Sequence, residues 1–355
     1  MLSANKAKKS PLPSGFFQCP PLSPDDVQQL KADAIQSAME VVMKSQLDNP
    51  RIKWTLRSDE VDLTIYRADD PSPGTYLYLS QMDVVGTLDE VGQLFLAQTT
   101  QQAKAVALRF GKEIFDAATL YSLVKPTLQD PLEFVGVTWK AYKSPLPFVA
   151  KRDACLIECC HSFLLDGRRG WVICTKSVEI DGCPEIENFG FTRMMNYGSG
   201  HVFLESDRPN HLEMRYVAHL NFRGVSYDEF SDGMLKRRDI VGDIAMTKRC
   251  RNLTAIDQFL REDRLARGHV LRPEEVVPQD LRPRCFLCDV RFGWTRQKSN
   301  CLKCGQVVCS SCNRVWRLVV NGRQVRLRAC ARCALSPAKS NASQMSTVLS
   351  DASSE

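Results

Sequence analysis

Long apolar runs and a secretory signal are both missing from this sequence. No segment approaches the eighteen or more apolar residues that a membrane-spanning helix needs. The opening stretch MLSANKAKKSPLPSG is basic but is not followed by the apolar core of a signal peptide. We therefore expect a cytoplasmic chain, where a reducing environment argues against a disulfide framework made from its fifteen cysteines.

Enzyme signatures are missing as well. The sequence has no G-x-S-x-G elbow, no Walker A loop, no dinucleotide-binding glycine pattern and no H-E-x-x-H helix. Only five histidines occur in 355 residues, and four of them are scattered over strand-like segments without metal-ligand spacing: His161, His201, His211 and His219. No acid–base pair stands out, so we expect no enzymatic activity.

Cysteine, in contrast, is abundant and partly regular. Some cysteines are irregularly spaced in apolar surroundings and are expected to be buried free thiols: Cys19, Cys155, Cys159, Cys160, Cys174, Cys183 and Cys250. The others form four C-x-x-C pairs between residues 285 and 333. Such a pair directs two thiolates at one tetrahedral Zn2+. Four thiolates leave no open position, so we expect two structural zinc ions and no catalytic metal.

The spacing of the four pairs predicts how they share the metals. Only four residues separate the second pair from the third, which is too short a connection for both to bind one ion easily. An interleaved cross-brace is therefore favoured, in which the first pair joins the third and the second joins the fourth. The expected ligands are Cys285, Cys288, Cys309 and Cys312 for zinc 1, and Cys301, Cys304, Cys330 and Cys333 for zinc 2.

Residues around these cysteines resemble the FYVE zinc finger. Phe292 stands four residues after the second cysteine, and GWT lies where the family has its turret loop. QKSNCLKCG is similar to the family's basic motif and RACARC to its R-V-C-x-x-C ending, so the likeness covers residues 281–335. The upstream W-x-x-D is absent, Ser299 and Asn300 replace two histidines, and Leu302 replaces an arginine.

The resemblance implies a membrane surface as partner. FYVE fingers insert apolar turret residues into the bilayer while basic side chains hold a phosphoinositide headgroup, and the corresponding residues here are Trp294, Arg296, Lys298 and Arg328. Because the two histidines are replaced, we expect weak, salt-sensitive binding with little selectivity for phosphatidylinositol 3-phosphate. Peripheral attachment to endosomal membranes belongs to the same expectation.

Acidic residues are nearly absent from this segment. Residues 281–333 contain twelve Lys and Arg against Asp289 alone, a formal charge of +11, which eight thiolates and two Zn2+ reduce to about +7. The whole chain carries only +6, so the finger holds the cationic surface. Such a surface attracts anionic lipid or nucleic acid. No aromatic-interleaved strand of the RNA-binding type accompanies it, so nucleic acid is not the expected partner.

Two other interpretations of the finger stay open. A RING-type ubiquitin ligase uses similar cysteine spacing, but it normally includes a histidine ligand and a proline in the last pair, and CARC has neither. A FYVE-type finger that has lost its lipid pocket and serves as a protein-interaction adaptor is the other alternative.

The longer part of the chain predicts an α+β domain. SPDDVQQLKADAIQSAMEVVMKSQ begins with Ser23 as N-cap and Pro24 in the first turn, and its apolar stripe predicts a helix. Three strand-like runs follow, then a helical stretch over residues 87–110 and a series of strands over residues 133–222.

A long helix from residue 226 to about residue 264 ends this part of the chain. Its expected apolar face includes Ile244, Leu253 and Ile256. This order of elements allows one antiparallel sheet to curl around the last helix and to enclose a cavity.

The order resembles the START lipid-transfer domain, a helix-grip fold, over residues 22–265. SPLPFVAKRDACLIECC is similar to the family's P-x-x-x-x-R-D strand entry at Arg152 and Asp153. GWVICTKSV is similar to its strand with an aromatic residue and a serine, and MRYVAHLNFRG to a strand ending in glycine. We expect Arg152 and Asp153 to form an ion pair at a strand end. The resemblance implies a hydrophobic ligand inside the domain.

The combined prediction is a non-enzymatic lipid-binding or lipid-transfer protein whose finger addresses it to a membrane or a protein partner. The expected division is a flexible start over residues 1–21, a START-like domain over 22–265, a Pro-rich linker over 266–280, a zinc finger over 281–335 and a Ser-rich disordered tail over 336–355.

Overall fold

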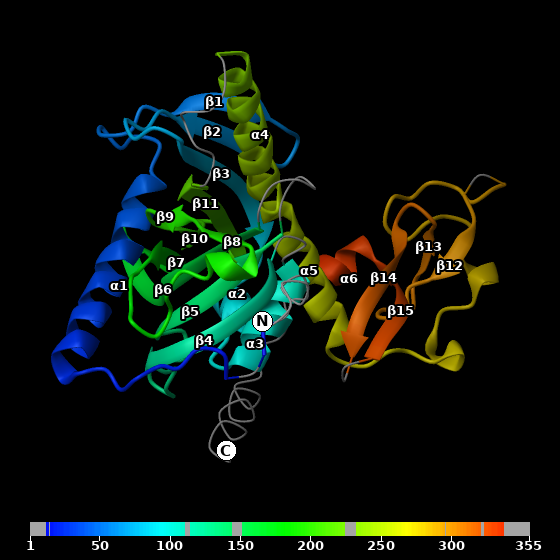
Figure 1. Cartoon of the computed structure of the whole chain (residues 1–355). Coiled ribbons are helices and arrows are strands. Elements are labelled where there is room, and N and C mark those ends of the chain that lie inside the picture. Colours follow the sequence, from blue (N-terminus) through cyan, green and yellow to red (C-terminus); the bar gives the residue numbers. More distant parts are fainter. Residues whose placement is uncertain are drawn as a thin grey trace. The chain divides into compact units, whose positions relative to one another are not determined.

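The computed structural model describes residues 12–13, 15–110, 114–143, 151–223, 232–294, 296–320 and 323–336. The chain divides into two units, Met1–Asp257 and Gln258–Glu355 (Figure 1). Parts of the sequence-based predictions lie outside the described residues: the segment SPLPFVA, Gly224 and nearly all of the Ser-rich tail. In the described ranges, no helix is long and apolar enough to cross a membrane.

Helix α1 (Pro24–Lys44) starts where the sequence predicts. The Ser23 hydroxyl accepts a hydrogen bond from the backbone N–H of Asp26, and the Asp26 carboxylate accepts one from the backbone N–H of Ser23, so the two residues form a capping box. Pro24 occupies the first turn, where its missing N–H costs nothing. The helix buries one stripe of side chains: Leu30, Ala34, Ser37, Ala38, Val41 and Val42.

Within the described residues, an 11-stranded sheet forms most of the first unit. Its main path runs in the order β1-β2-β3-β11-β10-β7-β6-β5-β4 with antiparallel pairing throughout, while β9 pairs with β11 and β8 pairs in parallel with β6. The strands are β1 (Thr55–Asp59), β2 (Thr64–Ala68), β3 (Thr75–Val85), β4 (Ile114–Val124), β5 (Phe134–Tyr142), β6 (Lys151–Leu165), β7 (Arg168–Ser177), β8 (Phe191–Arg193), β9 (Met195–Asn196), β10 (Ser199–Glu205) and β11 (His211–Asn221).

The segment between β3 and β5 contains one element that the sequence analysis misses. The helical stretch expected there is two helices, α2 (Leu88–Phe95) and α3 (Thr100–Phe110), and the edge strand β4 follows them. Most side chains of β4 are half-buried, and its pairing with β5 is interrupted by three register shifts. Such a strand lacks the regular apolar alternation by which strands are recognised in a sequence.

The expected long final helix is interrupted. A single residue, Asn252, separates helix α4 (Asp232–Arg251) from α5 (Leu253–Ala266). Leu253 and Ile256 are buried as predicted, but Ile244 is 61% exposed, so its assignment to the apolar face is wrong. Gly242, Asp243 and Cys250 contact the sheet and Met246 is buried, which leaves Ile244 on the solvent side.

Helices α1 and α4 pack on opposite faces of the sheet. Side chains of β3 alternate between the faces: Leu77 and Leu79 belong to the apolar cluster with α1, whereas Tyr76 and Tyr78 contact α4. A Cβ at Gly242 would collide with the Tyr76 hydroxyl, so the glycine lets α4 approach the sheet closely. Figure 1 shows α4 along β1, β2 and β3. The face that α4 covers is called the inner face below.

Asp243 anchors α4 to the first strands. Its carboxylate accepts hydrogen bonds from the Tyr78 hydroxyl and, at 2.6 Å, from Arg57 Nη2, and Arg67 Nη1 lies 3.7 Å away. Burial alone would raise the pKa of Asp243. The hydrogen bonds from Arg57 and Tyr78, with the charges of both arginines, outweigh burial and lower that pKa.

The second unit contains the finger. Strand β12 (Lys298–Asn300) pairs with β13 (Val307–Cys309), β14 (Asn313–Val320) pairs with β15 (Arg323–Cys330), and α6 (Ala331–Leu335) follows. Short 3-10 helices are Glu187–Phe189 in the first unit, and Pro273–Glu275 and Gln279–Leu281 in the second. The predicted fold class is confirmed: an α+β unit with an antiparallel sheet and a C-terminal helix, followed by a small cysteine-rich finger.

Replacing Asp243 by asparagine should lower the free energy of unfolding of the first unit by about 1–3 kcal/mol, because Tyr78 and two arginines lose a charged acceptor. Urea unfolding followed by circular dichroism measures the change. Asp83→Asn is the matched control, since Asp83 and Arg208 form an ion pair with 58% and 64% exposed side chains, worth less than about 1 kcal/mol. Equal losses in the two variants would contradict the anchoring role of Asp243.

Candidate functional site

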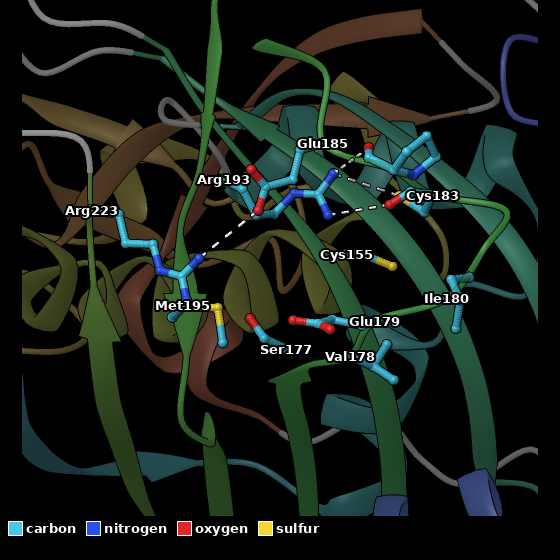
Figure 2. A pocket seen from close by; sticks show the side chains of 11 residues that line it. Cys155, Ser177, Val178, Glu179, Ile180, Cys183, Glu185, Arg193, Met195 and Arg223 are labelled. Carbon is cyan, nitrogen blue, oxygen red and sulfur yellow. Dashed lines mark hydrogen bonds and ion pairs between the residues drawn. The ribbon is translucent and has the colours of Figure 1, made fainter.

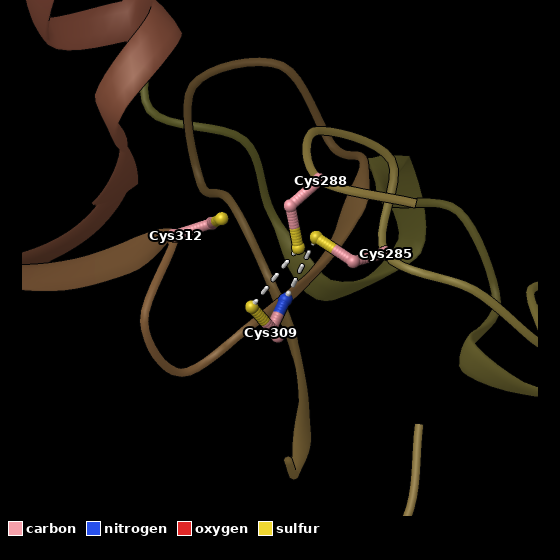
Figure 3. A group of neighbouring side chains, drawn as sticks. All are labelled: Cys285, Cys288, Cys309 and Cys312. Atoms are coloured by element: carbon pink, nitrogen blue, oxygen red, sulfur yellow. Dashed lines mark hydrogen bonds between the residues drawn. The ribbon is translucent and has the colours of Figure 1, made fainter. Parts of the chain in front are cut away.

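Four cysteines from two C-x-x-C pairs converge in the first half of the finger. The sulfur atoms of Cys285, Cys288, Cys309 and Cys312 all lie within 4.8 Å of one another (Figure 3). Cys288 Sγ and Cys309 Sγ are 3.8 Å apart, and the backbone N–H of Cys309 donates to Cys285 Sγ at 3.3 Å. Cys309 is the last residue of β13, so a strand end positions the third pair opposite the first.

A second quartet forms from the remaining two pairs. The sulfur atoms of Cys301, Cys304, Cys330 and Cys333 also lie within 4.8 Å of one another. Cys301 Sγ is 3.8 Å from Cys333 Sγ, Cys304 Sγ is 4.0 Å from Cys330 Sγ, and the backbone N–H of Cys330 donates to Cys301 Sγ at 3.3 Å. These groupings, first pair with third and second with fourth, are the ones that the spacing predicts.

Both quartets fit zinc. With a Zn–S distance of about 2.3 Å, tetrahedral coordination places neighbouring sulfurs about 3.8 Å apart. The separations that the structure gives are 3.8 Å, 3.8 Å and 4.0 Å, far longer than the roughly 2.05 Å of a disulfide. Each quartet can therefore hold one Zn2+. Four cysteine ligands leave no position for water or substrate, so the two metals are structural.

Apart from the cysteines, the finger has a small core. Its buried apolar cluster contains Leu265 from the end of α5, Val308, Leu318, Leu327, Ala329 and Ala334. A core of this size does not offset the entropy of ordering such a segment. Zinc binding supplies the missing folding free energy.

The expected membrane-inserting residue protrudes from the finger. Trp294 lies in a tight turn in which the backbone N–H of Arg296 donates to the carbonyl of Gly293 at 3.0 Å. The relative exposure of Trp294 is 103%, so its indole has no protein cover, while Arg296 is half-buried. An exposed tryptophan next to a cation is typical of residues that enter a membrane–water interface.

Lys298 is engaged inside the finger. Its Nζ donates to the carbonyl of Gln279 at 2.7 Å and lies 5.4 Å from the centre of the Phe292 ring. Ser299, the next residue, donates from Oγ to the carbonyl of Val308 at 3.3 Å. These contacts give both residues a structural role.

Asn300 bonds the segment before the first cysteine to the finger. Its Nδ2 donates to the carbonyls of Val277, at 2.7 Å, and Gly305, at 3.1 Å, and its Oδ1 accepts from Gln279 Nε2 at 2.9 Å. Ser299 and Asn300, which stand where the family has histidines, are thus both committed to internal hydrogen bonds. Neither presents a cationic ring to a phosphate.

The segment expected to be a linker makes backbone hydrogen bonds to the finger. The N–H of Leu271 donates to Leu302 at 2.8 Å, and the N–H of Val277 donates to Gly305 at 3.0 Å. Lys303 Nζ also donates to the carbonyl of Arg267 at 2.7 Å. Prolines and alternating charges gave no sign of this attachment. The attachment depends in part on the hydrogen bond between Gln279 and Asn300, and these residues lie too far apart in the sequence for a local pattern to show it.

The inner face of the larger unit carries a buried ion pair. Lys140 Nζ lies 2.6 Å from Glu158 Oε2, and the Thr138 hydroxyl lies 3.4 Å from the same oxygen. The side chains of Lys140 and Glu158 are 19% and 8% exposed. Burial, the largest single influence, would lower the pKa of Lys140, but the charge and hydrogen bond of Glu158, together with the charge of Tyr142, outweigh burial and raise it. This close pairing on the inner face was not foreseen from the sequence.

A neutral histidine lies on the same face. Burial, reinforced by the charge of Lys140, lowers the pKa of His201 to about 3, so its imidazole is uncharged at physiological pH. The ring stacks on Tyr216 with 4.6 Å between centres and lies 5.1 Å from Phe95. His201 and the Lys140–Glu158 pair add polar groups to an otherwise aromatic surface.

Arg152 and Asp153 do not pair with each other, which corrects the expectation from the sequence. Adjacent residues of β6 point to opposite faces. The Arg152 guanidinium donates to the carbonyls of Phe222, at 2.6 Å, and Arg223, at 3.0 Å. Asp153 accepts from Trp139 Nε1 at 2.9 Å and pairs with Arg193 at 2.9 Å. Both residues hold elements of the fold together.

A cavity of about 510 Å³ lies at the end of β7 (Figure 2). Arg193 crosses it and donates to the carbonyls of Pro184, at 2.8 Å, and Cys183, at 3.3 Å, and Arg223 lies 3.9 Å from Glu185. The lining residues are Cys155, Ser177, Val178, Glu179, Ile180, Cys183, Pro184, Glu185, Arg193, Met195 and Arg223. Three of its charged groups, Arg193, Arg223 and Glu185, are thus already engaged with backbone or with each other.

Comparison with known families decides the class of the second unit. Residues 275–338 match the model of the FYVE zinc finger. This segment is a FYVE zinc finger. The match begins inside the segment that Asn300 bonds to the finger, so the family's extent agrees with the hydrogen bonds described above.

The larger unit resembles solved START-related proteins. Human StAR-related lipid transfer protein 5 matches over 65% of this chain and 98% of that chain, at 16% identity and a TM-score of 0.48. Human STARD10 matches over 68% and 83%, at 11% identity and a TM-score of 0.41. The lipid transfer and protein localization domain of human StarD13 (DLC2) matches over 62% and 95%, at 14% identity and a TM-score of 0.37. No curated protein sequence gives a match. None of these matches names a catalytic family.

Cys309→Ser should release zinc and unfold the finger while the sheet of the first unit keeps its circular dichroism, because four thiolates are needed to close the first quartet. Metal analysis of the native protein should give two zincs per chain. Cys19→Ser, a change at a half-buried free thiol outside both quartets, should keep both metals. One zinc in the native protein, or two in Cys309→Ser, would refute the interleaved ligand sets.

Proposed function

We propose that this protein is a non-enzymatic lipid-binding protein. Its START-like unit holds a hydrophobic ligand on the inner face of the sheet, and its FYVE finger attaches the protein to an anionic membrane from the cytoplasm. The observation that supports the first part best is the buried Lys140–Glu158 pair among the aromatic side chains of that face.

A charged pair in an apolar interior is expensive to bury and adds little to stability. Its position fits a different task, since an amphipathic ligand needs one polar contact to orient it in an apolar space. Lys140, Glu158 and the neutral imidazole of His201 together offer hydrogen-bond donors and acceptors for a headgroup or hydroxyl. Apolar neighbours such as Phe203 would contact the rest of the lipid.

The double variant Lys140→Met/Glu158→Gln should fold and lose about tenfold or more of its bound lipid, because both charges go together and no unpaired charge stays buried. Native mass spectrometry of the full chain measures co-purified lipid. The matched control is Lys176→Met/Glu40→Gln, which removes an ion pair of 3.3 Å that involves α1 rather than the inner face, and it should keep the lipid. A native protein without lipid, or one that converts the lipid to product, would contradict the proposal.

The finger is proposed to bind membranes through Trp294, Arg296 and Arg328, while Lys298, which was expected to join them, is bonded to the carbonyl of Gln279. Trp294 supports this because its indole is fully exposed. Since Ser299 and Asn300 are bonded internally, we expect the charge of the lipid to matter more than the identity of its headgroup. Phosphatidylinositol 3-phosphate on endosomes is then one ligand among several anionic lipids.

Trp294→Ala should reduce co-sedimentation of the full chain with phosphatidylserine-containing vesicles by about fivefold or more, and 0.5 M salt should weaken binding of the native protein further. Leu128→Ala is the control, because Leu128 is a 75% exposed apolar residue of the first unit and should leave binding unchanged. Strong selectivity for phosphatidylinositol 3-phosphate would contradict the weak-headgroup expectation. Unchanged binding in Trp294→Ala would favour a protein-interaction adaptor.

A further inference from the structure

The hairpin of β14 and β15 has one buried and one open face. Cross-strand partners share a face, and the register pairs Trp316 with Leu327 on the side that packs into the finger. The other side is formed by three further pairs and is called the Arg/Val face: Val315 with Arg328, Arg317 with Arg326, and Val319 with Gln324. All six of its residues are exposed.

The Arg/Val face combines uncompensated positive charge with exposed apolar side chains. Residues 313–330 contain five arginines and no acid. The described part of the chain offers neither Arg317 nor Arg326 a carboxylate within ion-pair distance. Val315 and Val319 are 50% and 65% exposed, although a valine in a strand usually packs against a neighbour. Among the residues of the second unit that the structure describes, no ion pair or packing contact accounts for this surface.

Arg317 and Arg326 stand directly opposite each other across the two strands. Like charges at such positions destabilise a hairpin unless an anion lies between them. A groove of about 250 Å³ is lined by these two arginines with Gln324 and Val325, which is enough room for a phosphate group. Guanidinium groups bind phosphate oxygens in pairs of parallel hydrogen bonds, so two arginines at one groove suit a phosphodiester.

We propose that the Arg/Val face is a second membrane-binding surface of the finger, separate from the Trp294 turn. Arg317 and Arg326 would bind phosphates of anionic lipids at the groove, while Val315 and Val319 enter the boundary between headgroups and acyl chains. The proposal rests on the membrane role proposed above for the finger. Arg328, which the FYVE resemblance assigns to the headgroup, lies on the same face of the hairpin.

The side chains of this face favour a bilayer over other anionic partners. Single-stranded nucleic acid is held by aromatic residues that stack on bases, and the Arg/Val face has none. A bilayer presents phosphates directly above apolar chains, and this order matches guanidinium groups beside exposed valines. Three arginines close together also provide the several charges that weak peripheral attachment requires.

The test compares two double variants of the full chain that lose the same charge. Arg317→Gln/Arg326→Gln changes the Arg/Val face, whereas Arg314→Gln/Arg323→Gln removes two exposed arginines whose register places them on the other side of the same hairpin. Binding to phosphatidylcholine vesicles with phosphatidylserine is measured by co-sedimentation, and a zinc content of two per chain shows that each variant is folded. The first variant should bind about tenfold or more weakly, and the second should stay within about threefold of the native protein.

Other outcomes would overturn the proposal. Equal losses in both double variants would mean that only the overall charge matters. Full vesicle binding by Arg317→Gln/Arg326→Gln, together with a loss in Trp294→Ala, would leave the proposed membrane role standing and exclude this surface. A selective loss of binding to a single-stranded RNA oligonucleotide, with vesicle binding intact, would assign the face to nucleic acid. No vesicle binding by the native protein would reject both the membrane role and this extension of it.

Discussion

The two-residue alternation of side chains in the antiparallel sheet governs the larger unit. Because neighbouring residues of a strand face opposite ways, one sheet serves two environments. On one side, Leu77 and Leu79 join the apolar stripe of α1. On the other, Tyr76 and Tyr78 meet α4, and Lys140, Glu158 and His201 place polar groups in the interior. A shift of register by one residue would exchange these two sets and remove both the core and the candidate ligand surface.

The finger is small, and its two zinc–thiolate sites also place negative charge in its interior. Eight thiolates around two zincs carry a formal charge of −4 inside a small unit, and the surrounding arginines oppose it. Some cations are used internally, as when Lys298 and Lys303 bind backbone carbonyls. The arginines of β14 and β15 are spread along the hairpin instead. The cations at one end of the finger sequence therefore bind backbone carbonyls, whereas those of the hairpin stay exposed.

Features that depend on a few neighbouring residues could be predicted from the sequence. The N-cap of Ser23 and the interleaved cysteine pairs are of this kind, since residue type and spacing constrain them. Features that depend on distant partners could not. Strand β4 is held by its pairing with β5, and Ile244 is exposed because other residues of α4, such as Gly242 and Asp243, face the sheet.

The same limit applied to the candidate site. The exposed turn of Trp294 was expected from the resemblance to the FYVE turret, but the use of Lys298 as an internal donor depends on Gln279, which no local pattern indicates. Likewise, Glu158 and Lys140 lie on different strands, and only the register of β5 and β6 brings them together.

The cysteines differ in exposure, and this difference determines which of them react first with oxidants or electrophiles. Cys159 and Cys174 are buried in the sheet, and burial raises the pKa of each thiol, so they stay protonated and react slowly. Cys288, in contrast, is exposed at the edge of a zinc site. Oxidants or electrophiles would reach the metal ligands first. Under oxidative stress, the finger would therefore lose its metals and its fold while the sheet of the larger unit stayed folded.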